Sequence, residues 1–161
     1  MTAPVTPAFT LIDDRGREVT ERTYRGRFML VYFGFTHCRL VCPRALERLS
    51  AVLDALGPAA EQVQALYITV DPERDSPEVM RAYLTAHPRF TGLTGPGIED
   101  AKAAFRVFAR RRPDPEDPDG YAVPHTAISY LVDPEGRYVD HFTDALTAED
   151  LASRLAGLLT V

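Results

Sequence analysis

Two apolar runs constrain the fold of this chain more than any other feature of its sequence. Residues 28–35 (FMLVYFGF) and 63–70 (VQALYITV) are each long enough for one strand and contain few polar residues. A strand that is apolar on both faces must be covered on both faces, which is typical of parallel strands in α/β proteins. Between the two runs, Leu46, Leu49 and Leu53 have the spacing of an amphipathic helix. The sequence therefore predicts a β-α-β unit.

The rest of the chain continues the alternation of strands and helices. Asp-Arg-Gly at 14–16 and Asp-Pro-Glu-Gly at 133–136 mark the turns of two hairpins. The expected order is a hairpin over 9–20, a strand over 28–35, a helix over 43–56, a strand over 63–70, a helix over 78–86, a strand over 90–94, a helix over 97–108, a polar loop over 110–120, a hairpin over 127–142 and a helix from 147. This order predicts a single α/β domain over 1–161, with a mostly parallel sheet covered on both faces.

Composition excludes several classes of protein. The chain has 161 residues, 45% hydrophobic and 25% charged, which is ordinary for a globular domain with a core. A net charge of −5 gives no reason to expect nucleic acid or an anionic membrane surface as partner. No run approaches the ~20 apolar residues of a membrane span, and the start, MTAPVTPAFTL, has no signal-peptide pattern. These residues predict either a cytoplasmic protein or a chain whose leader or anchor was removed.

Cys38 and Cys42 are the only cysteines, and they lie between the first apolar run and its helix. The carboxyl end of a buried strand is the usual place for a site in an α/β sheet, and the amino end of a helix lowers a thiol pKa. Such a pair is a redox dithiol, part of a metal site, or an inert pair. The three intervening residues argue against a dedicated disulfide reductase, and two thiolates favour a soft ion, above all Cu(I).

A third ligand would come from one of four histidines. His37 adjoins a cysteine, so its side chain should diverge; His87 is expected at a helix end, and His141 is expected to face solvent. His125 leads from the polar loop into the strand expected at 127–132, which would place it at the sheet edge near the cysteines. A hydrogen-bonded structural role for His125 is the alternative.

Three segments together resemble the Sco/SenC family. They are YFGFTHCRLVCP at 32–43, VDPERDSPE at 70–78 and HTAISYLVDPEGR at 125–137, in the order and approximate spacing of the family. The resemblance implies a thioredoxin-like fold, with a central mixed sheet flanked by helices and an extra N-terminal β-hairpin. Cys38, Cys42 and His125 match the family's copper ligands. One copper per chain, Cu(I) or Cu(II), is therefore implied.

The resemblance also implies a function and a setting. The protein would be a metallochaperone that delivers copper to, or maintains the thiols of, a cytochrome c oxidase copper site. Its partner would be the copper-binding oxidase subunit or another copper-transfer protein. The protein itself would act as a monomer on the periplasmic or outer face of a membrane. The alternatives are a thiol-disulfide oxidoreductase that uses Cys38 and Cys42 without metal, and a peroxiredoxin-like peroxidase.

The chain departs from the family pattern beside both parts of the expected site. Arg39 and Leu40 stand where the family usually has Pro-Asp, and Pro124 stands where it usually has Asp before the histidine. A carboxylate is thus missing at both places, and a cation is added at one. Arg39 is expected to lower the pKa of neighbouring thiols, which favours thiolates, and to oppose a positive metal ion. Pro124 is also a candidate for the cis-proline of thioredoxin folds, although trans is the commoner state.

The segment 70–78 receives a structural interpretation. Asp71 and Asp75 belong to the family motif, and no metal role is assigned to them. Asp71-Pro72 has the pattern of a turn at a strand end, and Arg74 is expected to pair with a carboxylate. Ser76 or Asp75 is expected to cap the next helix.

Overall fold

The computed structural model describes residues 7–36, 41–107, 112–113, 121–122, 128–143 and 145–159. For residues 41–42, 112–113 and 121–122 it describes the backbone alone.

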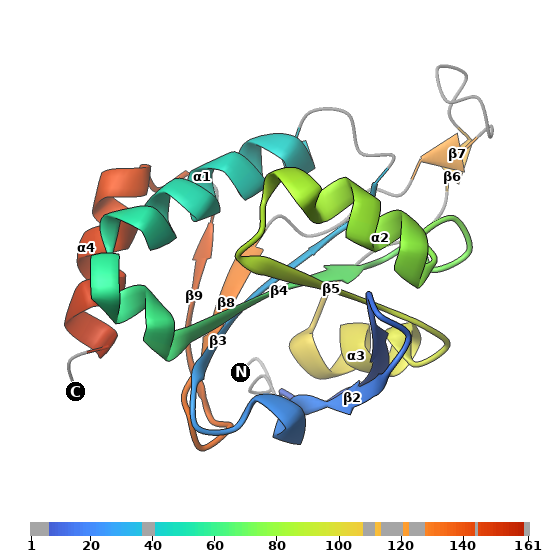
Figure 1. Cartoon of the computed structure of the whole chain (residues 1–161), viewed down its shortest axis with the longest axis horizontal. Coiled ribbons are helices and arrows are strands. Elements are labelled where there is room, and N and C mark those ends of the chain that lie inside the picture. The colour runs from blue at the N-terminus through green and yellow to red at the C-terminus, as the bar shows by residue number, and fades with distance from the viewer. Residues whose placement is uncertain are drawn as a thin grey trace.

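Seven strands form one mixed sheet in the order β2-β1-β5-β4-β3-β8-β9 (Figure 1). Their bounds are Thr10–Asp13 (β1), Glu18–Thr20 (β2), Phe28–Gly34 (β3), Val63–Thr69 (β4), Phe90–Thr94 (β5), Ile128–Val132 (β8) and Tyr138–Thr143 (β9). β3, β4 and β5 run parallel, and the other neighbouring pairs are antiparallel. The predicted mixed sheet with an N-terminal hairpin is therefore confirmed.

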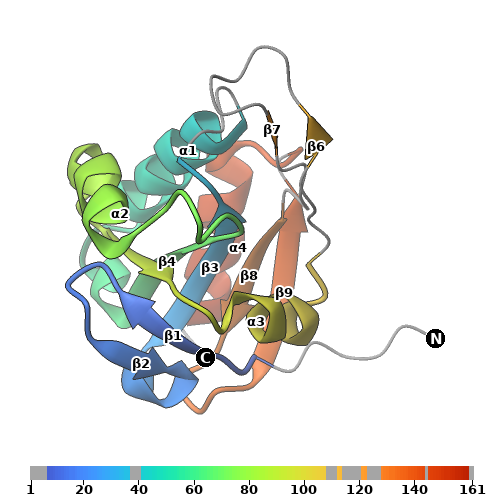
Figure 2. The ribbon, with the colours of Figure 1, turned by 90° about the vertical axis from the view of Figure 1, so that its right-hand side faces the viewer.

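The helices cover both faces of this sheet. They are α1 (Val41–Ala55), α2 (Pro77–Tyr83), α3 (Ile98–Phe105) and α4 (Ala148–Leu159), with short 3-10 turns η1 (Glu21–Tyr24), η2 (Gly57–Gln62) and η3 (Leu84–Ala86). α1 and α2 lie on one side and α3 on the other (Figures 1 and 2), and α4 packs against α1. In the described part of the chain, none of the helices combines the length and apolar character needed to cross a membrane.

The connectivity is thioredoxin-like, as predicted. β3, α1 and β4 form a β-α-β unit in which Phe28 pairs with Val63. β8, β9 and α4 form a β-β-α unit, which joins the first through antiparallel pairing of β8 with β3. β1 and β2 extend the sheet beyond β5.

Two predicted segments differ in detail from the structure. The helix expected over 97–108 ends at Phe105, because Arg106 adopts the left-handed conformation (φ 61°) that closes a helix. Within the polar loop expected over 110–120, Arg112–Pro113 (β6) forms a short strand, which pairs with Tyr121–Ala122 (β7) just after that loop as a separate two-stranded piece. Such short strands carry no alternation that a sequence pattern can reveal.

Aromatic side chains fill the core on both faces of β3. Phe33 packs edge-on against Phe105 of α3, with ring centroids 5.4 Å apart, and Phe105 is in turn 5.4 Å from Tyr130 of β8. On the opposite face Tyr32 stacks with Tyr67 of β4 at 6.3 Å. Adjacent residues of one strand thus enter two different layers, which explains why the run at 28–35 is apolar throughout.

Gly34 ends β3 at a point where no side chain fits. A Cβ atom built on Gly34 would lie 2.4 Å from the Tyr67 hydroxyl oxygen, well inside van der Waals contact. This close approach lets the Tyr67 hydroxyl donate a hydrogen bond to the Phe35 carbonyl oxygen at 3.2 Å. Glycine is therefore required at position 34 because the Tyr67 side chain, which binds the Phe35 carbonyl, packs directly against it.

Replacing Gly34 with alanine should lower the free energy of unfolding by about 1–3 kcal/mol, because overpacking of a tight core costs about this much. Gly157→Ala is the matched control. A Cβ there meets nothing within 4 Å, and α4 should gain up to about 1 kcal/mol from the better helix former. Urea denaturation of both variants checks the contrast, and effects of the same sign would contradict it.

The buried Tyr130 makes stability sensitive to alkaline pH. Burial, with a smaller contribution from Tyr138, raises the pKa of Tyr130 to about 12; an unfolded tyrosine has a pKa of about 10. The folded state therefore favours the protonated phenol, and this contribution is present below pH 10 and lost as the pH rises toward 12.

We expect the free energy of unfolding of the wild-type protein to fall more steeply between pH 10 and 12 than that of Tyr130→Phe. The phenylalanine retains the ring packing and has no proton to lose. Urea denaturation at a series of pH values measures both slopes. A difference between the two proteins that does not change with pH would contradict the expectation.

Candidate functional site

The segments that carry the predicted site meet at one edge of the sheet. β3 and β4 are parallel and end together, with Gly34 paired to Thr69. β8 is antiparallel to β3, with Ser129 paired to Tyr32, so β8 begins beside the end of β3. α1 starts a few residues after β3 and runs back along the sheet (Figure 1). This is the edge at which open α/β sheets hold their sites.

Most of the predicted site residues lie outside the described residues. They are His37, Cys38, Arg39, Leu40, Val123, Pro124 and His125. Cys42 is the second residue of α1, and its side chain is not described. The structure therefore places the ends of the segments that carry the predicted ligands. The ligand set Cys38, Cys42 and His125 itself stays a prediction.

The two remaining histidines have the surroundings that the sequence suggested. His87 follows η3 as its C-cap, and its Nδ1 lies 3.4 Å from the Ser50 hydroxyl oxygen. His141 is exposed on β9 and stacks with Tyr138, with ring centroids 6.1 Å apart. Among the described side chains, no group of three or more His, Cys, Asp or Glu residues is arranged to hold a metal ion.

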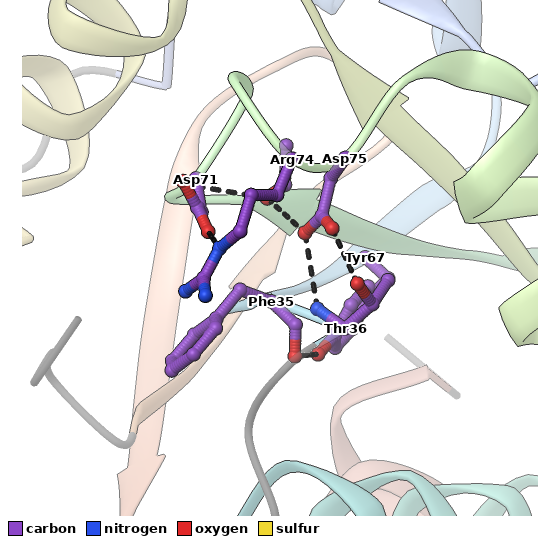
Figure 3. A network of polar contacts seen from close by, with 7 residues as sticks. Phe35, Thr36, Tyr67, Asp71, Arg74 and Asp75 are labelled. Carbon is purple, nitrogen blue, oxygen red and sulfur yellow. Dashed lines mark hydrogen bonds and ion pairs between the residues drawn. The ribbon is translucent and has the colours of Figure 1, made fainter. Parts of the chain in front are cut away.

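A buried polar network lies at this edge, centred on Asp75 (Figure 3). Asp75 has 0% of its surface exposed. Its Oδ2 accepts hydrogen bonds from the Thr36 backbone N–H at 3.0 Å and from the Thr69 hydroxyl at 2.7 Å. Its Oδ1 accepts a further bond from the Thr36 hydroxyl. The Thr94 hydroxyl donates to the Asp75 backbone carbonyl at 2.7 Å. One aspartate thus joins the ends of β3, β4 and β5.

The turn after β4 supports this aspartate. The Asp71 carboxylate pairs with Arg74, with Oδ2 and Nε 2.5 Å apart, so the expected ion pair of Arg74 is present. The Asp71 carbonyl accepts the backbone N–H groups of Arg74 at 3.2 Å and Asp75 at 3.0 Å. The Asp71 N–H donates to the Thr69 hydroxyl oxygen at 2.9 Å. These contacts close the turn and fix the backbone from which Asp75 projects.

The role of Asp75 and of the threonines around it does not follow from the sequence pattern. Of the two expected caps of α2, Ser76 and Asp75, the structure shows Ser76 as the cap, since its Oγ accepts the Val79 N–H at 3.2 Å. Asp75 instead points inward. A signal was present: Thr36 and Thr69 each follow or end a buried apolar run, which places two hydroxyls at one edge of a parallel pair.

Comparison with known proteins gives a consistent family. The SCO1/SenC family model matches residues 1–160. The mitochondrial SCO2 homolog of Danio rerio is 42% identical over 156 residues, which cover 91% of this chain and 56% of the relative. This chain therefore spans little more than half the length of that relative.

Solved structures of the family share the fold. Bradyrhizobium japonicum ScoI with copper bound superposes with a TM-score of 0.84 at 40% identity, over 94% of this chain and 98% of that chain. Yeast Sco1 with copper bound superposes with a TM-score of 0.89 at 34% identity, over 98% and 90%.

The family includes members named as mitochondrial proteins and a member named as a lipoprotein. The family model covers almost the whole chain, and the copper-bound relatives share its mixed sheet and helices, which confirms the predicted fold and the resemblance on which it rested. The chain belongs to the SCO1/SenC family.

Proposed function

We propose that this protein is a copper-binding metallochaperone that delivers copper to, or maintains the thiols of, a cytochrome c oxidase copper site. The observation that carries the proposal is the likeness to Bradyrhizobium japonicum ScoI, a structure with copper bound that matches 94% of this chain at 40% identity. The copper is cargo: the protein binds it and then gives it up to a partner.

The proposed ligands are Cys38, Cys42 and His125. The described ends of their segments support this choice. Cys42 lies in the first turn of α1, Cys38 is two positions after Thr36, and His125 is three positions before Ile128 at the start of β8. A chain reaches at most about 3.5 Å per residue, so three residues span about 10 Å. Since β8 starts beside the end of β3, all three segments are tethered to one edge of the sheet.

This donor set suits the transfer of copper. Two thiolates and an imidazole form a soft set that Cu(I) prefers over hard cations. Three protein ligands leave room for a ligand from a partner, so the metal can pass from one protein to the other by stepwise exchange of thiolates. Arg39, between the two cysteines in sequence, stabilises thiolates and opposes the charge of the bound ion, so it should favour release.

We further propose the setting in which the protein acts. Its partner is the copper-binding subunit of cytochrome c oxidase or another copper-transfer protein, and it acts as a monomer. The mitochondrial name of the zebrafish relative and the lipoprotein name of another family member support a place outside the cytoplasm, at a membrane face.

A second candidate function is thiol-disulfide exchange without metal. The observation that favours it is the position of Cys42 in the first turn of α1, where the partial positive charge of the helix end stabilises a thiolate. In this function Cys38 and Cys42 reduce a disulfide of the partner and become oxidised to a disulfide themselves.

The copper proposal predicts one copper per chain, bound through sulfur. Titration of the reduced protein with Cu(I) against a chromophoric chelator should give a stoichiometry of one, and Cu(II) should produce a sulfur-to-copper charge-transfer absorption. Cys38→Ser and His125→Ala should each weaken binding by at least about tenfold, because each removes a ligand.

His141→Ala is the matched control for the histidine variant, since His141 is exposed on β9 and is not a proposed ligand. It should bind copper like the wild-type protein. Unchanged stoichiometry and affinity in Cys38→Ser or His125→Ala would overturn the ligand assignment.

The second function makes a separate prediction. If disulfide exchange is the main activity, the metal-free reduced protein turns over a protein disulfide, and Cys38→Ser abolishes this turnover, whereas His125→Ala retains it. An insulin-reduction assay with the metal-free protein measures the rate. If the protein binds copper and shows no turnover above the glutathione background, disulfide exchange is excluded and only the chaperone function remains.

A further inference from the structure

We propose that Asp75 is a positioning residue for the segment that carries Cys38 and Cys42, and that it acts by holding Thr36. The inference rests on the proposed function for its copper readout. It also has a consequence for the two thiols that requires no metal.

Thr36 is the last described residue before the cysteine segment, and its backbone N–H and its hydroxyl both bind one carboxyl group. Its backbone N–H donates to Oδ2 of Asp75 at 3.0 Å, and its hydroxyl donates to Oδ1 (Figure 3). The first bond fixes the main chain, and the second fixes the side-chain rotamer. Two bonds to two oxygens of one planar group also fix the orientation of Thr36, which one bond alone would leave free to rotate.

The carboxyl group is itself held in place. Asp75 is fully buried, and the Thr69 hydroxyl donates to its Oδ2 at 2.7 Å. Its backbone is held from two sides, by the bond from its N–H to the Asp71 carbonyl and by the bond from the Thr94 hydroxyl to its own carbonyl. Thr69 ends β4 and Thr94 ends β5, so Thr36 is tied through Asp75 to two further strands.

A simpler structural role does not account for Asp75. Ser76, not Asp75, caps α2. The donors that the structure gives the Asp75 carboxyl are neutral hydroxyl and amide groups, within the described residues. Burying a carboxyl group has an unfavourable desolvation cost that an apolar residue would avoid. Its most specific contact is with the residue from which the cysteine segment departs.

The preceding residue is held as well. The Tyr67 hydroxyl donates to the Phe35 carbonyl, and Gly34 leaves space for that hydroxyl. The Phe35 carbonyl and the Thr36 N–H belong to one peptide unit, which is therefore held on both sides, by Tyr67 of β4 and by Asp75. The cysteine segment starts from a rigid point.

A rigid start should favour both states in which the two sulfurs are close. Metal ligands bind more tightly when supporting hydrogen bonds fix them in advance, and loss of such support typically weakens binding by about 10–100-fold. A disulfide likewise requires its two sulfurs within a narrow geometry. In exchange with glutathione, two thiols lose two electrons and two protons as the S–S bond forms, and glutathione disulfide becomes two glutathione thiols. Loosening Thr36 should therefore weaken copper binding and shift this equilibrium toward the dithiol.

Thr36→Val tests the proposal, because it removes the hydroxyl and keeps the shape of the side chain. We expect Cu(I) affinity to fall about tenfold and the disulfide to become about tenfold less stable against glutathione. Thr36→Ser restores the hydroxyl and should restore both values. Thr147→Val is the matched control: it removes a hydroxyl that accepts the Asp150 N–H at 3.1 Å at the start of α4, outside the contacts of Asp75. It should leave both values within about twofold of wild type, even where urea denaturation shows the same loss of stability.

Equal changes in Thr36→Val and Thr147→Val would show a general effect of destabilisation and would overturn the proposal, as would unchanged values in Thr36→Val. If Thr36→Val does not fold, Asp75→Asn, which keeps the size and one acceptor oxygen, is measured in the same way. If the wild-type protein binds no copper, the proposed function fails, and the glutathione equilibrium still decides whether Asp75 positions the cysteine segment.

Discussion

The pairing of β3 on both edges is the constraint on which the rest of the structure depends. β3 is hydrogen-bonded to β4 along its whole length and to β8 along its central part, and aromatic side chains cover both faces. The residues that follow β3 therefore leave the sheet from a strand that is held on both edges and on both faces.

The strand and helix order was accessible from the sequence because the strongest patterns belong to the most buried elements. The runs at 28–35 and 63–70 and the leucine stripe of α1 are long, and each is dominated by one requirement, burial. The end of α3 was not accessible, since Arg106 closes it by a left-handed conformation that an arginine rarely adopts. The pairing of β6 with β7 depends on two residues in each strand and gives no periodic signal.

The sequence leads to a predicted ligand set, which stays a prediction, whereas it does not lead to the buried network beside that set. Cys38, Cys42 and His125 stand out because sulfur and imidazole are rare in this chain and the family motifs contain them. Asp75 does not stand out: an aspartate before Ser-Pro is a typical helix-cap pattern, and only the fold reveals that it points inward to Thr36 and Thr69. Contacts between the ends of parallel strands join residues far apart in sequence, and in a single sequence nothing connects position 36 with position 75.

The proposed ligands and the buried network of Asp75 involve different residues, and the departures from the family pattern lie beside the proposed ligands. Arg39, Leu40 and Pro124 replace residues beside the expected ligands, whereas the network of Thr36, Thr69 and Asp75 lies outside those positions. These departures are expected to alter the charge near the sulfurs. A nearby cation lowers the pKa of a thiol and opposes the binding of a metal ion by the thiolate. Within the described residues, the network of Thr36, Thr69 and Asp75 contains no cation bound to Asp75. Its geometry therefore does not depend on the charge of Arg39. In the proposed function, residues between the cysteines can thus change the balance between copper binding and thiol exchange, while Asp75 still holds Thr36 at the start of the cysteine segment.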